Sequence, residues 1–178
     1  MNGSHTLLVF PALLCGIETV SEAVEDKQLS ELLSACLNGY ILCALGETES
    51  NIKLANAVLE RFRNPYLVHR WESISLNSVS KFSARVLPTV EDIIKKGGEA
   101  PILMCFSLAS LIYYYKNYEP KDLESAVSFI KSNSISDILS NTRLWGKDIA
   151  FLLPATEQCY EKIEKSGIRK ALGGALSL

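Results

Sequence analysis

Two residues at the start of the chain have side chains that could act on a carbonyl or hydroxyl group. Asn2 and His5 are three positions apart, so a helical turn would place the amide and the imidazole on one face. An amide donor beside an imidazole can polarise a carbonyl or orient a hydroxyl. The competing interpretation is that Asn2 and Ser4 only cap a helix and that His5 is a solvated first-turn residue. Spacing alone favours this second interpretation.

A second polar cluster lies between Tyr66 and Pro88, in a segment that we expect to be helical. Polar side chains recur there every four residues, which predicts a polar stripe formed by His69, Ser73, Asn77, Lys81 and Arg85. The segment has three positive charges and one negative charge, namely Arg70, Lys81 and Arg85 against Glu72. A local positive excess favours an anionic small molecule such as a carboxylate. The alternative is an ordinary solvated helix face.

The elements that must position these residues are expected to be helices, because the apolar residues recur with helical period and strand-like alternation is scarce. We therefore predict an all-α, multi-helical fold. The segment Pro101–Tyr115 is apolar on almost every side, which predicts a central buried helix. The expected helices are Ser4–Val24 with a kink at Pro11, Gln28–Leu45, Ser50–Arg63, Tyr66–Ile94, Pro101–Tyr115, Lys121–Lys131, Ser134–Ser140 and Ala155–Leu172, followed by a frayed tail at Gly173 and Gly174.

Length and composition predict one globular domain over residues 1–178. The chain has 178 residues, of which 48% are hydrophobic, and we find no linker that would divide it. Its net charge of −2 argues against sequence-independent binding of nucleic acid. The apolar run Thr6–Gly16 lacks the basic residues of a signal peptide, and no run has the ~18 apolar residues of a membrane span. We therefore expect a cytoplasmic protein without a membrane partner.

Complete cofactor, nucleophile and metal motifs are absent from the sequence. It has no GxGxxG, P-loop, HExxH or GxSxG pattern, so a self-sufficient enzyme is not expected. The five cysteines contain no CxxC pair, and only His5 and His69 are available as imidazole ligands, so no metal site is predicted. The cysteines are expected to be buried thiols in a reducing compartment.

Two separated motifs give the chain a resemblance to a known family. The motifs are Asn2-Gly3-Ser4-His5-Thr6 and, much later, Arg61-Phe62-Arg63-Asn64-Pro65 with His69 and the run Ser75–Phe82. In this order they resemble the long-chain mannitol dehydrogenase family, and more closely its hexuronate branch, the tagaturonate reductases or altronate oxidoreductases. The resemblance extends from Asn2 to the last helix.

This resemblance implies a two-domain, NAD-dependent oxidoreductase of which the chain is the second part. The family has an N-terminal Rossmann domain that binds NAD, followed by a helical substrate domain like that of 6-phosphogluconate dehydrogenase. We therefore expect the Rossmann domain to be absent from this chain. The family's catalytic lysine would lie five positions before Asn2, so we expect that Met1 falls within a motif of a longer protein and that the chain alone is inactive.

The resemblance also implies roles for individual residues in the interconversion of tagaturonate and altronate. Asn2 would hold the developing oxyanion, His5 would orient substrate hydroxyls, and Lys81 would bind substrate. Polyol-specific relatives have an arginine at the position of Ser73 and Asp-Gly-Ser in place of Asn77-Ser78-Val79. The partner of the substrate carboxylate therefore stays open, and the candidate substrate-binding residues are Lys81, His69, Asn77, Arg70 and Arg85.

Two other functions remain open at this stage. The chain could belong to a relative that acts on fructuronate or on a polyol. It could also be a non-enzymatic helical interaction domain, whose polar stripe binds a partner.

Overall fold

The computed structural model describes residues 2–41, 46, 48–62 and 69–178. The described residues form helices and no strand, which confirms the all-α class; one isolated antiparallel bridge joins Thr19 and Arg70. The likeness to 6-phosphogluconate dehydrogenase stays a prediction. The helical elements in chain order are α1 (Asn2–Leu14), α2 (Val20–Glu25), α3 (Lys27–Ala35), the π-helix η1 (Cys36–Ile41), α5 (Glu49–Phe62), α6 (Trp71–Ile74), α7 (Ser78–Arg85), α8 (Leu87–Lys95), α9 (Ile102–Asn117), α10 (Glu124–Ser132), α11 (Ile135–Ser140), α12 (Thr142–Trp145), the 3₁₀-helix η2 (Ala150–Leu152), α13 (Leu153–Ser166) and α14 (Ile168–Leu176).

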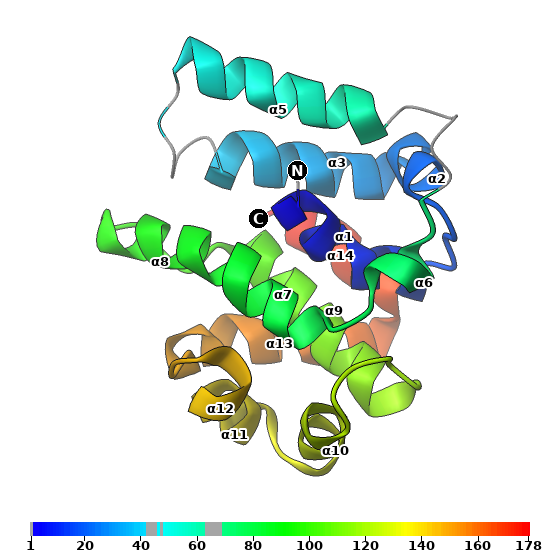
Figure 1. The fold of residues 1–178 in the computed structure, drawn as a ribbon, viewed down its shortest axis with the longest axis vertical. Coiled ribbons are helices and arrows are strands. Elements are labelled where there is room, and N and C mark those ends of the chain that lie inside the picture. The colour runs from blue at the N-terminus through cyan, green and yellow to red at the C-terminus, as the bar shows by residue number, and fades with distance from the viewer. Residues whose placement is uncertain (1, 42–45, 47, 63–68) are drawn as a thin grey trace.

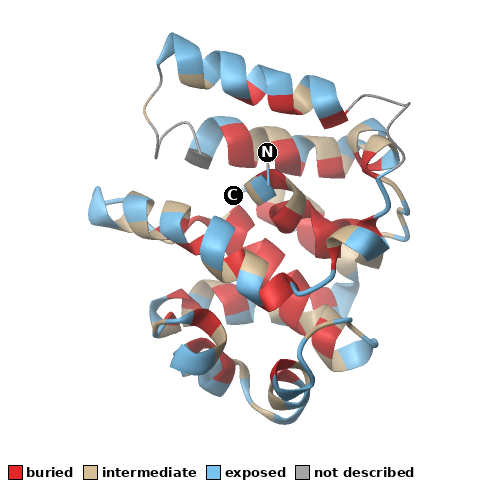
Figure 2. Cartoon of the chain, in the orientation of Figure 1, coloured by how far each residue is buried: buried red, intermediate tan, exposed pale blue. Residues whose placement is uncertain are grey.

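Helix α9 is the centre of the fold (Figure 1), and α1, α10, α13 and α14 pack against it. Every residue from Leu103 to Ile112 is buried, as Figure 2 shows for the central helices, so the predicted central helix is confirmed. Two serines within this run donate hydrogen bonds to carbonyl oxygens one turn earlier, Ser107 to Leu103 and Ser110 to Phe106. Because these hydrogen bonds form within the helix, the two hydroxyl groups are buried without the cost of an unsatisfied polar group.

The predicted first helix Ser4–Val24 is wrong, because the chain leaves the helical path after Leu14. Gly16 has φ 76°, a left-handed conformation that glycine adopts without steric cost. A new helix, α2, then begins after Thr19, whose side chain accepts from the Glu22 N–H while the Glu22 carboxylate accepts from the Thr19 N–H. This capping box fixes the start of α2. Pro11 lies inside α1, and the kink there stays a prediction.

The predicted helix Tyr66–Ile94 is also wrong, since its described part forms three short helices, α6, α7 and α8. Asn77 has φ 53° and ψ 46°, the left-handed conformation that asparagine tolerates better than most residues. At the second break, Val86 has φ −110° and α8 starts at Leu87 with Pro88 in its first turn. The change of direction at each break means that residues four apart do not form the single polar stripe that we predicted.

Most of the other predicted helices are present with altered ends. Helix α5 confirms Ser50–Arg63, although Arg63 lies outside the described residues, and α10 and α11 confirm the two short helices. The predicted helix Gln28–Leu45 changes to π-helical hydrogen bonding after Ala35, and residues 42–45 lie outside the described part. The last predicted helix is divided at Gly167, where φ is 79°. Gly173 and Gly174 lie within α14 instead of a frayed tail, and α12 and η2 were not predicted.

Across the described ranges, none of the helices combines the length and the apolar character that crossing a membrane requires.

Candidate functional site

The first candidate pair, Asn2 and His5, lies in the first turns of α1, and this helix packs against α6 and α7. Asn2 is exposed and His5 is half-buried. The Thr6 hydroxyl donates to the Asn2 carbonyl oxygen at 3.0 Å, which satisfies a backbone acceptor within the turn. The amide of Asn2 and the imidazole of His5 are thus at the N-terminal end of α1, where the backbone N–H groups carry partial positive charge.

The imidazole of His5 lies among three aromatic rings from two other parts of the sequence. It stacks on Phe62, the last residue of α5, with ring centroids 4.3 Å apart and an interplanar angle of 26°. Its centroid is 6.3 Å from that of His69 and 6.2 Å from that of Trp71. The structure thus brings together two predicted site residues, His5 and His69. Phe62 and Trp71 were not predicted as part of the site, because their sequence pattern is that of core residues.

Two polar groups near this aromatic cluster are buried without a hydrogen-bond partner in the part of the chain that the structure describes. They are the hydroxyl of Ser4 and the indole Nε1 of Trp71, and both residues are at most 1% exposed. A buried donor or acceptor that makes no hydrogen bond costs about 1–3 kcal/mol. The cost at these two positions makes them candidates for a role other than stability.

The N-terminal end of α1 is in close contact with the C-terminal end of α7. A Cβ atom added at Gly3 would be 3.2 Å from the carbonyl oxygen of Arg85. Glycine at this position therefore lets the two backbones approach each other. Arg85 itself is exposed, so its backbone lies at the first turn of α1 while its charged group is accessible to solvent.

Lys81 is held in the middle of α7 by a hydrogen bond to the preceding helix. Its Nζ donates to the carbonyl oxygen of Ile74, the last residue of α6, at 2.9 Å. Partial burial lowers the pKa of Lys81, repulsion from Arg85 lowers it further, and the carboxylate of Asp122 acts in the opposite direction. The ammonium group has three N–H donors, of which Ile74 takes one.

Arg70 is directed away from this group of residues. Its guanidinium forms an ion pair with Glu18 at 3.1 Å, next to backbone hydrogen bonds that join the two segments. Glu18 follows the C-terminal end of α1, whereas Asn2 begins the helix, and 13 helical residues span roughly 20 Å. Arg70 lines a hollow of about 460 Å³ at that far end, with Leu13, Gly16, Ile17, Glu18, Glu72 and Tyr114.

Asn77 lies at the start of α7, at the opposite end of this helix from Arg85. Its backbone N–H donates to the carbonyl oxygen of Lys121 at 3.0 Å, and its side chain is exposed and does not cap α7. The structure therefore groups His5 with His69, and Gly3 with Arg85. It directs Arg70 elsewhere and gives Asn77 the role of a turn residue.

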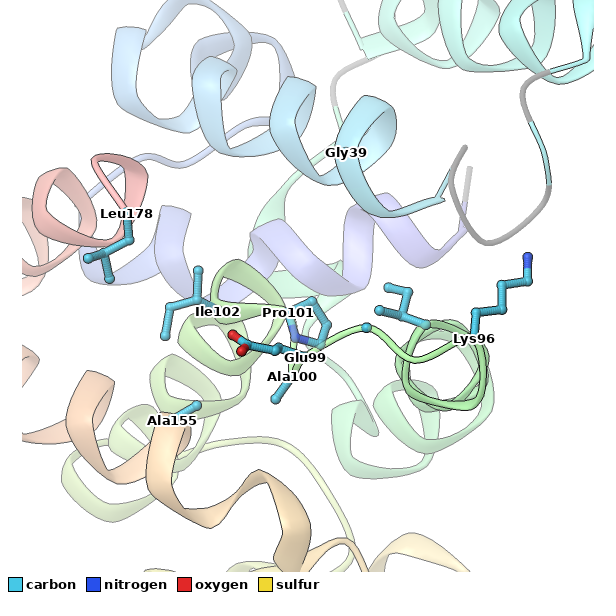
Figure 3. Close-up of a pocket in the computed structure, with 10 residues that line it drawn as sticks. Gly39, Lys96, Glu99, Ala100, Pro101, Ile102, Ala155 and Leu178 are labelled. Carbon is cyan, nitrogen blue, oxygen red and sulfur yellow. The ribbon is translucent and has the colours of Figure 1, made fainter.

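A separate hollow of about 710 Å³ contains none of the predicted site residues. This hollow lies where α8, α9 and α13 meet the C-terminus, as Figure 3 shows. Its lining residues are Gly39, Ile93, Lys96, Gly98, Glu99, Ala100, Pro101, Ile102, Ala155 and Leu178. Within the described ranges, no group of three histidine, cysteine or acidic side chains is arranged to hold a metal ion.

Comparison with known proteins identifies this arrangement of helices. The family model described as mannitol dehydrogenase C-terminal domain matches residues 1–167. Among curated proteins, altronate oxidoreductase of Halalkalibacterium halodurans is 32% identical over 210 aligned residues, covering 99% of this chain and 41% of the relative. Altronate oxidoreductase of Bacillus subtilis is 33% identical, covering 97% of this chain and 38% of the relative. The chain thus spans about two-fifths of the length of these relatives.

Solved structures share the fold at lower sequence identity. Pseudomonas fluorescens mannitol 2-dehydrogenase, in a ternary complex with NAD and D-mannitol, superposes with a TM-score of 0.87 at 22% identity and covers 99% of this chain and 39% of that one. A substrate-free D-sorbitol dehydrogenase superposes with a TM-score of 0.80 at 21% identity, covering 97% and 38%. The chain belongs to the mannitol dehydrogenase C-terminal domain family.

Proposed function

We propose that this chain is the substrate-binding part of an NAD-dependent oxidoreductase that interconverts tagaturonate and altronate. The observation that carries the proposal is the position of the first turns of α1 beside α6 and α7: His5 is close to Trp71 in α6, and Gly3 lies against the backbone of Arg85 in α7, the helix that contains Lys81. Relatives named altronate oxidoreductase that align along nearly the whole chain support the choice of a sugar acid over a neutral polyol.

In this proposal, the residues of the chain bind and orient the substrate. The Asn2 amide donates to the oxygen that gains negative charge, and the helix terminus on which it lies favours that charge. The His5 imidazole, fixed by stacking on Phe62, orients substrate hydroxyls. His69 lies close enough to His5 to extend the same surface.

We assign the substrate carboxylate to Lys81 and Arg85. Both are positive groups on α7, and the C-terminal end of this helix contacts the first turn of α1. Arg70 is not chosen because it is paired with Glu18. Asn77 is given no direct contact with substrate, since it forms the turn before α7.

The described residues do not fit a dinucleotide. They form no strand, and so no strand–turn–helix unit of the kind whose glycine-rich turn binds a pyrophosphate. We therefore expect that NAD binds to a Rossmann domain outside this chain, and that the proton-transfer lysine also lies outside it. Purified chain should show no NADH-dependent reduction of tagaturonate, and measurable turnover would contradict this division of the site.

Ligand binding by the chain itself tests the proposal most directly. We expect altronate to shift the NMR signals of His5, His69 and Lys81, and Lys81→Ala to weaken binding at least about tenfold through loss of a charge-assisted contact. The matched control is Lys116→Ala, because Lys116 is another half-buried lysine that donates to a backbone carbonyl, that of Asn133, but lies on α9. Its affinity for altronate should equal that of the unmodified chain.

The same titration separates the alternatives. Equal affinity for altronate and mannitol would favour a polyol dehydrogenase, and tighter binding of fructuronate than of tagaturonate would favour the other hexuronate reaction. Binding of none of these compounds would contradict the proposal and favour a helical interaction domain.

We include a cytoplasmic location in the proposal, without a nucleic-acid or membrane partner. Its support is the net charge of −2 and the four free thiols among the described residues, Cys15, Cys36, Cys105 and Cys159.

A further inference from the structure

A partly buried contact that the sequence motifs do not include joins Asp122 to the helix that contains Lys81. Asp122 Oδ2 accepts a hydrogen bond from the backbone N–H of Val79 at 3.1 Å and another from the hydroxyl of Tyr115 at 2.6 Å. Its Oδ1 accepts from the N–H of Leu123 at 2.7 Å. One carboxylate therefore links the first turn of α7 to α9 and to the start of α10.

The first turn of α7 needs such a partner from elsewhere in the chain. Asn77 precedes this helix in a left-handed conformation and its side chain makes no capping hydrogen bond, so it does not satisfy the N–H groups of the turn. The Asp122 carboxylate supplies the missing acceptor from 43 residues away, and its charge suits the positive end of a helix. The Lys121 carbonyl, next to it, accepts the N–H of Asn77.

Tyr115 keeps this carboxylate in place. The Tyr115 ring is fully buried, and burial together with the hydrogen bond to Asp122 raises the pKa of its hydroxyl well above the ordinary value. The hydroxyl therefore remains a donor throughout the pH range in which the protein would work. A donor on the rigid central helix thus fixes the position of the Asp122 oxygen that holds α7.

We propose that Asp122 is the positioning residue of Lys81: its carboxylate, bonded to the Val79 N–H, fixes the first turn of α7, from which Lys81 directs its side chain at the carbonyl oxygen of Ile74. The proposal rests on the assignment of Lys81 to substrate binding. Lys81 lies within one turn of Val79, and attraction to Asp122 opposes the two effects, burial and repulsion by Arg85, that lower the pKa of Lys81.

Among the charged groups near α7, Arg85 and Asp122 are the ones whose charge acts on Lys81. On the elements around α7, two of the acidic groups are in ion pairs, Glu72 with Lys121 and Glu91 with Lys147. Further titratable or charged groups on the helices that pack against α7 or precede it are His5 on α1, Asp92 and Lys95 on α8, and Arg143 on α12.

Acylation of lysines in the intact chain tests the proposal without any sugar acid. Neutral amines react with acetic anhydride, so a lower pKa gives faster modification at a fixed pH below it. We expect Asp122→Asn, which keeps an acceptor oxygen but removes the charge, to speed acetylation of Lys81 roughly threefold, because loss of the negative charge lowers the pKa of Lys81 further. Acetylation of Lys116, whose pKa burial also lowers, should be unchanged.

Amide hydrogen exchange at Val79 tests the positional part. We expect Asp122→Ala, which removes the acceptor, to speed exchange of the Val79 N–H at least about tenfold, whereas Asp122→Asn should restore slow exchange. An unchanged acetylation rate at Lys81 in Asp122→Asn, or an equal rise at Lys116, would overturn the proposal. If Asp122→Ala fails to fold, the acetylation rates of Lys81 and Lys116 in Asp122→Asn test the proposal by themselves. Failure of altronate to bind while Lys81 responds as expected would overturn the proposed function instead.

Discussion

The central helix α9 and the segment α6–α8 illustrate two ways of building helical structure in one chain. Helix α9 is continuous for 16 residues, and a run of ten of them is fully buried. The segment α6–α8 contains polar and apolar residues in similar numbers, and it is divided into helices of 4, 8 and 9 residues. One is held by burial on all sides, and the other by one buried face together with individual hydrogen bonds to distant residues.

The difference separates a helix held by packing from a segment that depends on specific polar contacts. Between Leu103 and Ile112, the core helix has apolar side chains and two serines that bond within the helix, so this run needs no outside partner except packing. The segment near the candidate site has serines, which are poorer helix formers than alanine, a left-handed asparagine that interrupts the helix, and a half-buried lysine whose pKa burial lowers. Its contacts with Trp145, Asp122 and Ile74 compensate. Four variants or conditions can break or sharpen this comparison.

The largest effect is expected for Phe106→Ala in α9. Phe106 is 0% exposed, and truncation of a buried phenylalanine costs about 3–5 kcal/mol because a cavity remains. Urea denaturation followed by circular dichroism would measure the loss. The control is Leu76→Ala between α6 and α7, where the side chain is 39% exposed and the cost should be below about 0.5 kcal/mol. Equal losses in the free energy of unfolding for Phe106→Ala and Leu76→Ala would contradict the conclusion that burial on all sides holds α9.

Alkaline pH should act on the core more than on the site segment. Burial raises the pKa of Cys105 on α9 from 9.0 to about 12. The unfolded chain therefore releases this proton first, so the stability contributed by the neutral thiol is complete below pH 9 and is lost as pH rises toward 12. At pH 11 the loss expected from Cys105 is about 3 kcal/mol.

Denaturation curves at pH 8, 10 and 11 would measure this loss. Cys105→Ala should make the decline shallower without removing it, because burial also raises the pKa of Cys36 and Cys159, and an unchanged slope would show that Cys105 does not contribute. The pH dependence expected from Lys81 has the opposite sign. Its pKa is lowered in the folded chain, so its contribution to stability increases with pH between that lowered value and 10.5.

Asn77→Ala should destabilise the site segment by about 1 kcal/mol, because alanine adopts the left-handed conformation less readily than asparagine. Asn77→Gly should change the free energy of unfolding by only a few tenths of a kcal/mol. The order of the two variants, determined by thermal denaturation, is the decisive observation. If glycine is as harmful as alanine, the Asn77 side chain has a role beyond the turn.

The smallest effect is expected for Ser83→Ala on α7. The Ser83 hydroxyl donates to the Trp145 carbonyl oxygen at 2.6 Å across 62 residues, and loss of such a bond costs about 0.5–1.5 kcal/mol. The better helix propensity of alanine offsets about 0.5 kcal/mol of it. Ser80→Ala is the matched control, since Ser80 bonds only to the nearby Asn77 carbonyl and is exposed. A chemical denaturation series should show Ser80→Ala as neutral or slightly stabilising.

Helix interiors could be predicted from the sequence, but several helix boundaries could not. The apolar run of α9 and the faces of α5 follow directly from periodicity. The breaks at Gly16, Asn77 and Gly167 depend on single residues with positive φ, and the same residue types at Gly39 and Gly173 lie inside helices. Local composition does not separate these cases, because the contacts on either side of a break decide whether the chain turns.

The candidate site shows the same division. The residue types of Asn2, His5 and Lys81 were recognisable from the motifs that they form. The aromatic neighbours of His5 were not, since Phe62 and Trp71 are separated from it by more than fifty residues and have the pattern of core side chains. The ion pair of Arg70 with Glu18 was missed for the same reason.

The sequence by itself determined the helical class, the buried central helix and the residue types available for chemistry, because each follows from local period and composition. Only the tertiary structure decided which of those residues meet. It brought His5 to His69 and turned Arg70 away, because contacts between distant segments depend on the direction of the chain after each turn. The physical reason is that a left-handed residue such as Asn77, and a carboxylate such as Asp122, set that direction through bonds that no local pattern encodes.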